Sequence, residues 1–219
     1  MSDKALNSAM LELTQKIQLH FPRNINTGII SAWNGCPKEV LAEKLLEVFG
    51  KNPPSQERLI DFVGTFVVPE IATSFIAREN FIVDMNKKAK VRISHLGDNF
   101  KENFLGKIEE PFVGSTLRYG KLKKDSVDRP IIAELGGEKA ETSLAEMFTL
   151  MEQRPNGEDG ALLTNGYANI FYIRDKKGVL WAVDCRWHDV GWRVVADSVD
   201  YPYEWRGGYQ VFSRSSSES

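Results

Sequence analysis

The sequence predicts an α+β protein, in which an N-terminal helical portion of about three helices precedes a β-rich portion with an antiparallel C-terminal meander and one packed helix. Two observations predict this class. Apolar residues recur every three or four positions in the first third of the chain, which is the period of a helix, and they alternate with polar residues near the C-terminus, which is the period of a strand. With 219 residues, 42% of them hydrophobic, the chain can bury a core of its own.

The N-terminal portion is expected to contain three helices. The first is predicted from the apolar series Leu6, Met10, Leu13, Ile17 and Phe21. The second spans residues 37–49, because Pro37 suits a first helical position and Gly50 suits the end of a helix. The third spans residues 55–66, with Ser55 as its N-cap.

The centre of the chain is expected to be rich in strands. The stretches FIVD, KVRIS, STLRYGKL and PIIAEL are short and are separated by glycines and charged turns. The stretch DNFKENFLGK between them favours a short helix. A longer helix is predicted over residues 141–153, where Thr142 or Ser143 is the N-cap and the sequence RPNG follows the end.

Four further strands are expected to form the meander, namely ANIFYIRD, VLWAVDCRW, WRVVADSV and YQVFSR. The first three are separated by turns that end in glycine, which supplies the positive φ that such hairpin loops often need. We divide the chain into a helical region 1–76, a β-rich domain 77–213 and a flexible tail 214–219.

Three of the five tryptophans lie within twelve positions of this meander. Trp187 and Trp192 are expected on the apolar strand face, where they meet across the HDVG turn as a cross-strand pair. Two uses fit this pattern: the indoles fill the core against the helix 141–153, or some stay exposed as a binding platform. For the second use, the candidate partner-binding residues are Trp187, Trp192, Tyr203 and Trp205.

Residue types common in catalysis give one weak candidate site. His95 ends a predicted strand close to Asp98, a pairing that suits a general base, and Arg118 can stabilise an anion. Ser94 points to the opposite strand face from His95 and cannot serve as its nucleophile. The sequence contains no metal-ligand motif, phosphate loop or nucleotide-binding glycine pattern, so neither a metal nor a cofactor is expected.

The formal charge of −2 gives no overall attraction to nucleic acid, but residues 84–129 hold 11 Lys or Arg against 7 Asp or Glu. These cations either protect exposed strand edges or form a strip for an acidic partner or nucleic acid. The basic strip consists of Lys87, Lys88, Lys90, Arg92, Lys121, Lys123 and Lys124.

The stretches GDNFKENFLGK, ALLTNGYANIFYIRD, GVLWAVDCRW and GWRVVADSV followed by QVFSR resemble a recurrent pattern in uncharacterised proteins of small-genome candidate-phylum bacteria. The likeness extends to the segments 32–37 and 154–158. It implies a stand-alone bacterial protein with a recurrent Trp-rich β module at its C-terminal end, and it implies no activity.

The sequence therefore favours a non-catalytic recognition protein that uses an aromatic C-terminal β surface and binds a protein or peptide. A hydrolase or nucleic-acid-processing enzyme centred on His95 and Asp98, with the basic strip, is the alternative, and direct nucleic-acid binding is the second alternative. Because the chain has no secretory leader and no apolar run of membrane-spanning length, we expect a cytoplasmic protein with no membrane partner.

Overall fold

The structure, a computed structural model, describes residues 37, 40 and 58–215. The chain divides into two compact units, Met1–Gln56 and Glu57–Ser219, and the described fold is that of the second unit. The first two predicted helices lie outside the described residues, apart from residues 37 and 40. The division into regions 1–76, 77–213 and 214–219 stays a prediction, because most of the first region is not described.

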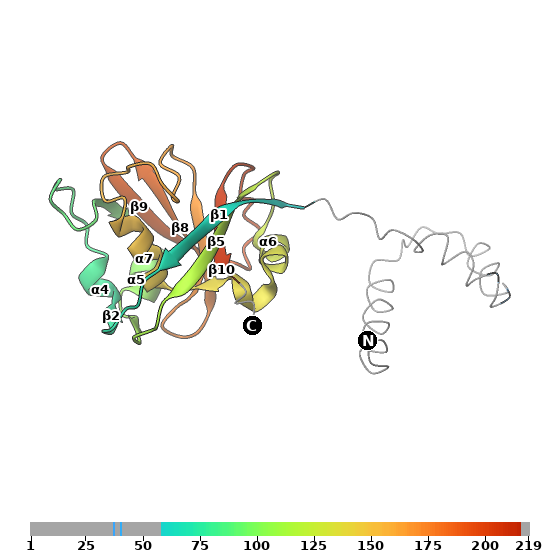
Figure 1. Ribbon diagram of the computed structural model, residues 1–219, viewed down its shortest axis with the longest axis horizontal. Helices are drawn as coiled ribbons and strands as arrows, with labels where there is room; N and C mark the ends of the chain where they lie inside the picture. Colours follow the sequence, from blue (N-terminus) through green and yellow to red (C-terminus); the bar gives the residue numbers. More distant parts are fainter. Residues whose placement is uncertain (1–36, 38–39, 41–57, 216–219) are drawn as a thin grey trace. The chain divides into compact units, whose positions relative to one another are not determined.

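An eight-stranded mixed sheet forms the centre of the second unit (Figure 1). Its strands are β1 (Ile60–Val68), β3 (Ile93–Leu96), β5 (Ser115–Leu122), β6 (Glu141–Thr142), β7 (Asn169–Arg174), β8 (Leu180–His188), β9 (Gly191–Ser198) and β10 (Gln210–Arg214). The order across the sheet is β1-β5-β10-β7-β8-β9-β3, and β6 pairs separately with β7. The pairings of β10 with β7, β3 with β9 and β6 with β7 are parallel, and the others are antiparallel.

Short helices and a second small sheet connect these strands. The helices are α4 (Ala77–Asn80), α5 (Asp98–Phe104), α6 (Asp128–Leu135), the 3-10 helix η1 (Gly137–Ala140) and α7 (Leu144–Glu152). The small sheet pairs β2 (Phe75–Ile76) with β4 (Ile108–Glu109). The short helix expected from DNFKENFLGK is α5, and the helix expected over residues 141–153 is α7, with Ser143 as its N-cap.

The predicted fold class is wrong, because the described part of the chain is mostly β and a three-helix N-terminal portion is not supported. Of residues 55–66, predicted as the third helix, residues 60–66 instead lie in the edge strand β1, and residues 55–57 lie outside the described residues. Leu59, Phe62 and Phe66 fit a helical spacing, but the segment is also rich in β-branched residues, and pairing with β5 decides the outcome. Gly64 leaves room for the Tyr119 side chain of β5, whose hydroxyl would lie 2.9 Å from an added Cβ.

Three further elements correct the prediction for the centre and end of the chain. PIIAEL lies in helix α6 rather than in a strand, with Pro130 in the first turn and Gly136, at φ 100°, as the left-handed C-cap. FIVD contributes only an isolated bridge between Asp84 and Ile93. The last strand, β10, does not extend the meander beyond β9, because it lies between β5 and β7.

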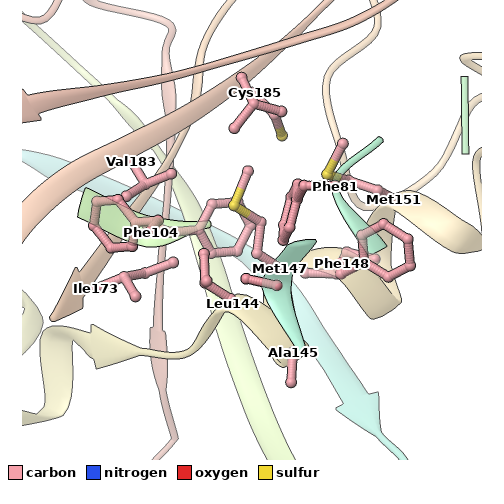
Figure 2. Packing of buried hydrophobic residues seen from close by; sticks show 14 of the residues in the cluster. Phe81, Phe104, Leu144, Ala145, Met147, Phe148, Met151, Ile173, Val183 and Cys185 are labelled. Atoms are coloured by element: carbon pink, nitrogen blue, oxygen red, sulfur yellow. The ribbon is translucent and has the colours of Figure 1, made fainter. Parts of the chain in front are cut away.

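Both faces of the central sheet are covered, so the strands contribute to two cores. On one face, side chains of β7, β8, β9 and β10 pack against α5 and α7, and Figure 2 shows Met147 and Phe148 of α7 in the same core as Val183 and Cys185 of β8. The other face packs against α6, η1 and the segment that carries Trp205. The first five residues of β7 are accordingly all buried.

The N-terminus of α7 is satisfied entirely by side chains. The Ser143 hydroxyl accepts a hydrogen bond from the Glu146 amide at 3.1 Å, and the Glu146 carboxylate accepts one from the Ser143 amide at 2.7 Å. Glu109 of β4 accepts the amides of Leu144 and Ala145 at 3.0 and 2.9 Å. The two carboxylates also lie at the positive end of the helix dipole, which favours their negative charge. The start of α7 is therefore stabilised by its N-cap Ser143, by Glu146 and by Glu109.

Candidate functional site

Two of the four predicted partner-binding aromatic residues are sealed inside the protein. Trp192 and Trp205 have no exposed surface, which corrects the expectation that they form a binding platform. Trp187 is partly buried, and Tyr203 retains 38% of its surface. Of the four, Tyr203 is therefore the one that the structure presents most openly to a partner.

Trp187 and Trp192 form the predicted cross-strand pair. They are direct partners in the register of β8 with β9, and their rings meet edge to face with centroids 5.4 Å apart. Gly157 presses against Trp187, since an added Cβ would lie 2.1 Å from the indole, and the Arg92 guanidinium lies 5.7 Å from its centroid. The Trp192 indole donates a hydrogen bond to the Arg154 carbonyl at 3.0 Å, so this pair chiefly anchors the segment around Gly157.

The segment 199–209 is fastened to the other sheet face through Trp205. Its indole nitrogen donates to Asp128 Oδ1 at 2.7 Å, and the Tyr172 hydroxyl donates to the same oxygen at 2.8 Å. Trp205 also exchanges two backbone hydrogen bonds with Ser126, both of 2.9 Å. Burial raises the pKa of Asp128, while the two donors oppose that rise.

A second buried carboxylate, Asp184, supports the same segment. Asp184 of β8 is fully buried and accepts a hydrogen bond from the Arg186 Nε at 2.7 Å. Burial raises the pKa of Asp184 to about 6 even though Arg186 acts to lower it, and Asp197 of β9 adds a neighbouring negative charge. The Arg186 guanidinium in turn lies 5.3 Å from the Tyr209 ring centroid and interacts with Tyr203.

Above this network the chain presents a short exposed loop, residues 200–204, which we call the tyrosine loop. Its sequence is DYPYE, and all of its residues are exposed, Tyr201 with 66% of its surface. The Tyr203 ring rests edge to face on buried Trp205, with centroids 5.0 Å apart. No Lys or Arg occurs in the sequence from Asp197 to Glu204, and the cations that reach this loop, Arg129 and Arg186, come from α6 and β8.

The predicted basic strip is not one surface. Lys87, Lys88, Lys90 and Arg92 precede β3 at one side of the sheet, whereas Lys121, Lys123 and Lys124 lie at the end of β5 near the other side. The strands β10, β7, β8 and β9 lie between β5 and β3, which corresponds to roughly 24 Å along the sheet. A nucleic-acid site that requires a continuous strip is therefore not formed.

The candidate catalytic residues do not converge either. His95 is exposed on β3, whereas Arg118 lies on β5 with the same four strands between them. Asp98 is exposed at the start of α5 and pairs with Lys101 at 3.0 Å. Arg118 is occupied within the fold, since it donates to Ser213 and to the Leu135 carbonyl and stacks over Phe62 at 4.4 Å.

The residues that the sequence analysis missed are Asp128, Asp184 and Arg186. The alternation of β8 puts Asp184 and Arg186 on the strand face opposite Val183 and Cys185, and charged residues on one face of a strand are typical of a face open to solvent. It is instead covered by α6 and the segment 199–209. An Asp and an Arg two positions apart on one strand face were the available signal, and only the covering segment reveals that Asp184 is buried and Arg186 partly buried.

No family model matches the chain, and no curated protein or solved structure matches it. The resemblance to proteins of candidate-phylum bacteria therefore stays a prediction. Within residues 37, 40 and 58–215, no group of three or more His, Cys, Asp or Glu side chains is arranged to hold a metal ion. No helix in the same part of the chain has the length and apolarity to span a bilayer.

Proposed function

We propose that the protein is a recognition protein that binds a positively charged segment of a protein or peptide through the tyrosine loop. The observation that carries this proposal is the exposure of Tyr201 and Tyr203 between two carboxylates on an anchored loop. Tyrosine is enriched in binding hot spots because its ring provides apolar contact and its hydroxyl a hydrogen bond.

The charge of the loop favours a cationic ligand. Asp197, Asp200 and Glu204 are close in sequence. Arg129 pairs with Asp200 at 3.3 Å in an exposed and therefore weak ion pair, and Arg186 acts on the less exposed Asp197, so Glu204 and much of the Asp200 charge stay accessible to a partner. A Lys or Arg of the partner gains from these carboxylates and can also lie over a tyrosine ring. A partner rich in Asp or Glu would be repelled by the same charges.

The buried network supports binding by holding the loop in place before the partner arrives. Trp205 is fixed by Asp128 and by the paired backbone bonds with Ser126, and Asp125 accepts the Gly207 amide at 2.8 Å. A loop that is ordered in the free protein loses less conformational entropy on association. Asp184 is fully buried and touches no surface, so we assign it to this support and not to catalysis.

A selection of peptides from a random-sequence library on the immobilised full chain tests the proposal. We expect enrichment of peptides with Lys or Arg, and a loss of affinity of at least about tenfold in the double variant Tyr201→Ser, Tyr203→Ser. Asp200→Asn with Glu204→Gln should also weaken binding. Asp98→Asn with Glu102→Gln makes the same charge change on α5 and should leave affinity unchanged.

Two results would overturn this function. Selected peptides without a Lys or Arg preference would remove the charge argument. Equal affinity of the wild type and the double tyrosine variant, both folded by circular dichroism, would remove the tyrosine loop as the contact surface.

A further inference from the structure

The segment between α4 and β3 exposes aliphatic side chains that nothing among the described residues covers. Ile82, Val83 and Met85 keep 54%, 54% and 55% of their surface. Figure 1 shows this segment, drawn in turquoise to green, projecting at the left of the view beyond the end of β9. We call residues 82–88 the projecting loop. Three exposed aliphatic residues within four positions differ from the single apolar residues that occur scattered on most protein surfaces.

The base of the projecting loop is fixed, so the exposure is a stable feature. Phe81 is buried and meets the rings of Phe100 and Phe148 edge to face, with centroids 5.0 and 5.2 Å apart. The backbone of Asp84 exchanges two hydrogen bonds with Ile93 at 3.0 and 3.1 Å. Folding thus holds the aliphatic side chains outward and does not bury them.

Two lysines complete the loop. Lys87 and Lys88 are exposed at the turn, whereas Lys90 is engaged by Glu152 at 2.8 Å and lies over the Phe148 ring. Asp84 is the single acid of the projecting loop, and its Oδ1 accepts the Asn86 amide at 2.8 Å. The loop therefore combines an aliphatic group with a small local excess of positive charge.

We propose that the projecting loop binds the surface of an anionic lipid bilayer. Ile82, Val83 and Met85 enter the boundary between headgroups and acyl chains, and the ammonium groups of Lys87 and Lys88 contact lipid phosphates. The expectation of no membrane partner rested on the lack of a spanning segment, which surface binding does not require. The net charge of −2 opposes binding little, since salt screens charges beyond about 8 Å at physiological strength.

The chemistry of the loop distinguishes a bilayer from other partners. Protein interfaces are enriched in aromatic residues, Met and Arg and depleted in Lys, whereas this loop has no aromatic residue or Arg and carries two lysines, with Met85 as its one residue of an enriched type. A nucleic acid would use the lysines but gives three aliphatic side chains no apolar region to enter. An anionic bilayer uses both groups at once.

Sedimentation of the full chain with lipid vesicles tests the proposal. We expect binding to phosphatidylcholine vesicles that contain about 30% phosphatidylglycerol, and weaker binding to pure phosphatidylcholine. Ile82→Ser with Met85→Ser, and separately Lys87→Glu with Lys88→Glu, should each lower the partition coefficient at least about tenfold. Because these residues are exposed, the variants should fold, which their urea midpoints will verify.

The matched control is Lys121→Glu with Lys123→Glu, which makes the same charge change at exposed positions near the opposite side of the sheet. It should change binding by less than about twofold. If this control lowered the partition coefficient as much as the Lys87 and Lys88 variant does, the loss would be due to net charge and the proposal would be overturned. Three other results would also overturn it. The variant with Ile82→Ser and Met85→Ser could bind vesicles as strongly as the wild type, or the wild type could fail to bind vesicles at all. The wild type could also prefer a DNA duplex, through Lys87 and Lys88 alone.

Discussion

At the scale of single residues, the structure is marked by carboxylates that the fold buries and uses as acceptors. Asp128 and Asp184 each bind donors through one oxygen, and the second oxygen of each has no hydrogen-bond partner among the described residues. A buried carboxylate of this kind is costly when charged, which is why the pKa of both is raised. Their contribution to stability therefore changes with pH.

For Asp184, the direction in which stability changes with pH can be worked out. Its folded-state pKa of about 6 exceeds the ordinary value of 3.8, so the group binds its proton more tightly in the folded protein. The stability it contributes is complete below pH 3.8 and is lost as the pH rises through about 6. We expect the unfolding free energy of Asp184→Asn, relative to wild type, to rise by about 1 kcal/mol between about pH 5 and about pH 7.5.

Urea unfolding at both pH values measures this difference. Asp184→Ser should give the same pH dependence, because the effect arises from the loss of the carboxyl group and not from the residue that replaces it. A difference that stays constant across this pH range would show that Asp184 is not protonated in the folded protein near pH 5.

At the scale of elements, helix α7 depends partly on groups that come from outside the helix. Glu109 from β4, Ser143 and the Glu146 side chain satisfy its first turn, and Arg214 of β10 binds the same Glu146 carboxylate at 3.1 Å. The helix is thus joined by ion pairs and hydrogen bonds to strands that are distant in sequence. Its start is fixed by these contacts as well as by its apolar face.

The N-cap of α7 can be tested separately from these distant contacts. Ser143→Ala removes the hydroxyl that accepts the Glu146 amide and should lower the unfolding free energy by about 1 kcal/mol. Ser143→Asn retains a good N-cap acceptor and should cost much less. Urea midpoints of the two variants compare them, and a Ser143→Ala variant as stable as the wild type would mean that Glu109 and Glu146 suffice without the Ser143 hydroxyl.

The elements also mark the limit of what could be predicted from the sequence. β7, β8, β9 and α7 were recognised because their alternation, glycine turns and capping residues are local features. The apolar residues of 60–68 fit both a helical and a strand period, and only pairing with the distant strand β5 makes this segment a strand. Alternation also placed Trp192 on the correct strand face, but it could not reveal that both faces of the sheet are covered, so it left open whether this residue fills the core or forms a binding surface.

At the scale of the whole molecule, the two cores share one sheet, so neither face opens without the other being disturbed. Cys185 is fully buried on β8 in the core with α7. Burial raises the pKa of its thiol well above the ordinary value, which keeps the reactive thiolate scarce. Its reaction with a thiol reagent therefore reports opening of the sheet.

We expect the Cys185 thiol to react with a disulfide reagent at least about a thousandfold more slowly in native buffer than in denaturant. The measurement uses a Cys36→Ser background, so that the absorbance change comes from Cys185 alone. The rate should rise with urea in parallel with global unfolding. Fast labelling in native buffer would instead indicate local opening of β8 away from α7.

The position of β10 has a consequence for biosynthesis. This strand joins the pair β1 and β5 to the group β7, β8 and β9, yet it is the last strand of the sheet in the sequence. A ribosome makes every neighbour of β10 before it makes β10, so a nascent chain holds two incomplete half-sheets with open edges until residues 210–214 emerge. Cells must protect those edges from aggregation during translation, and a chain truncated before Gln210 would never close them.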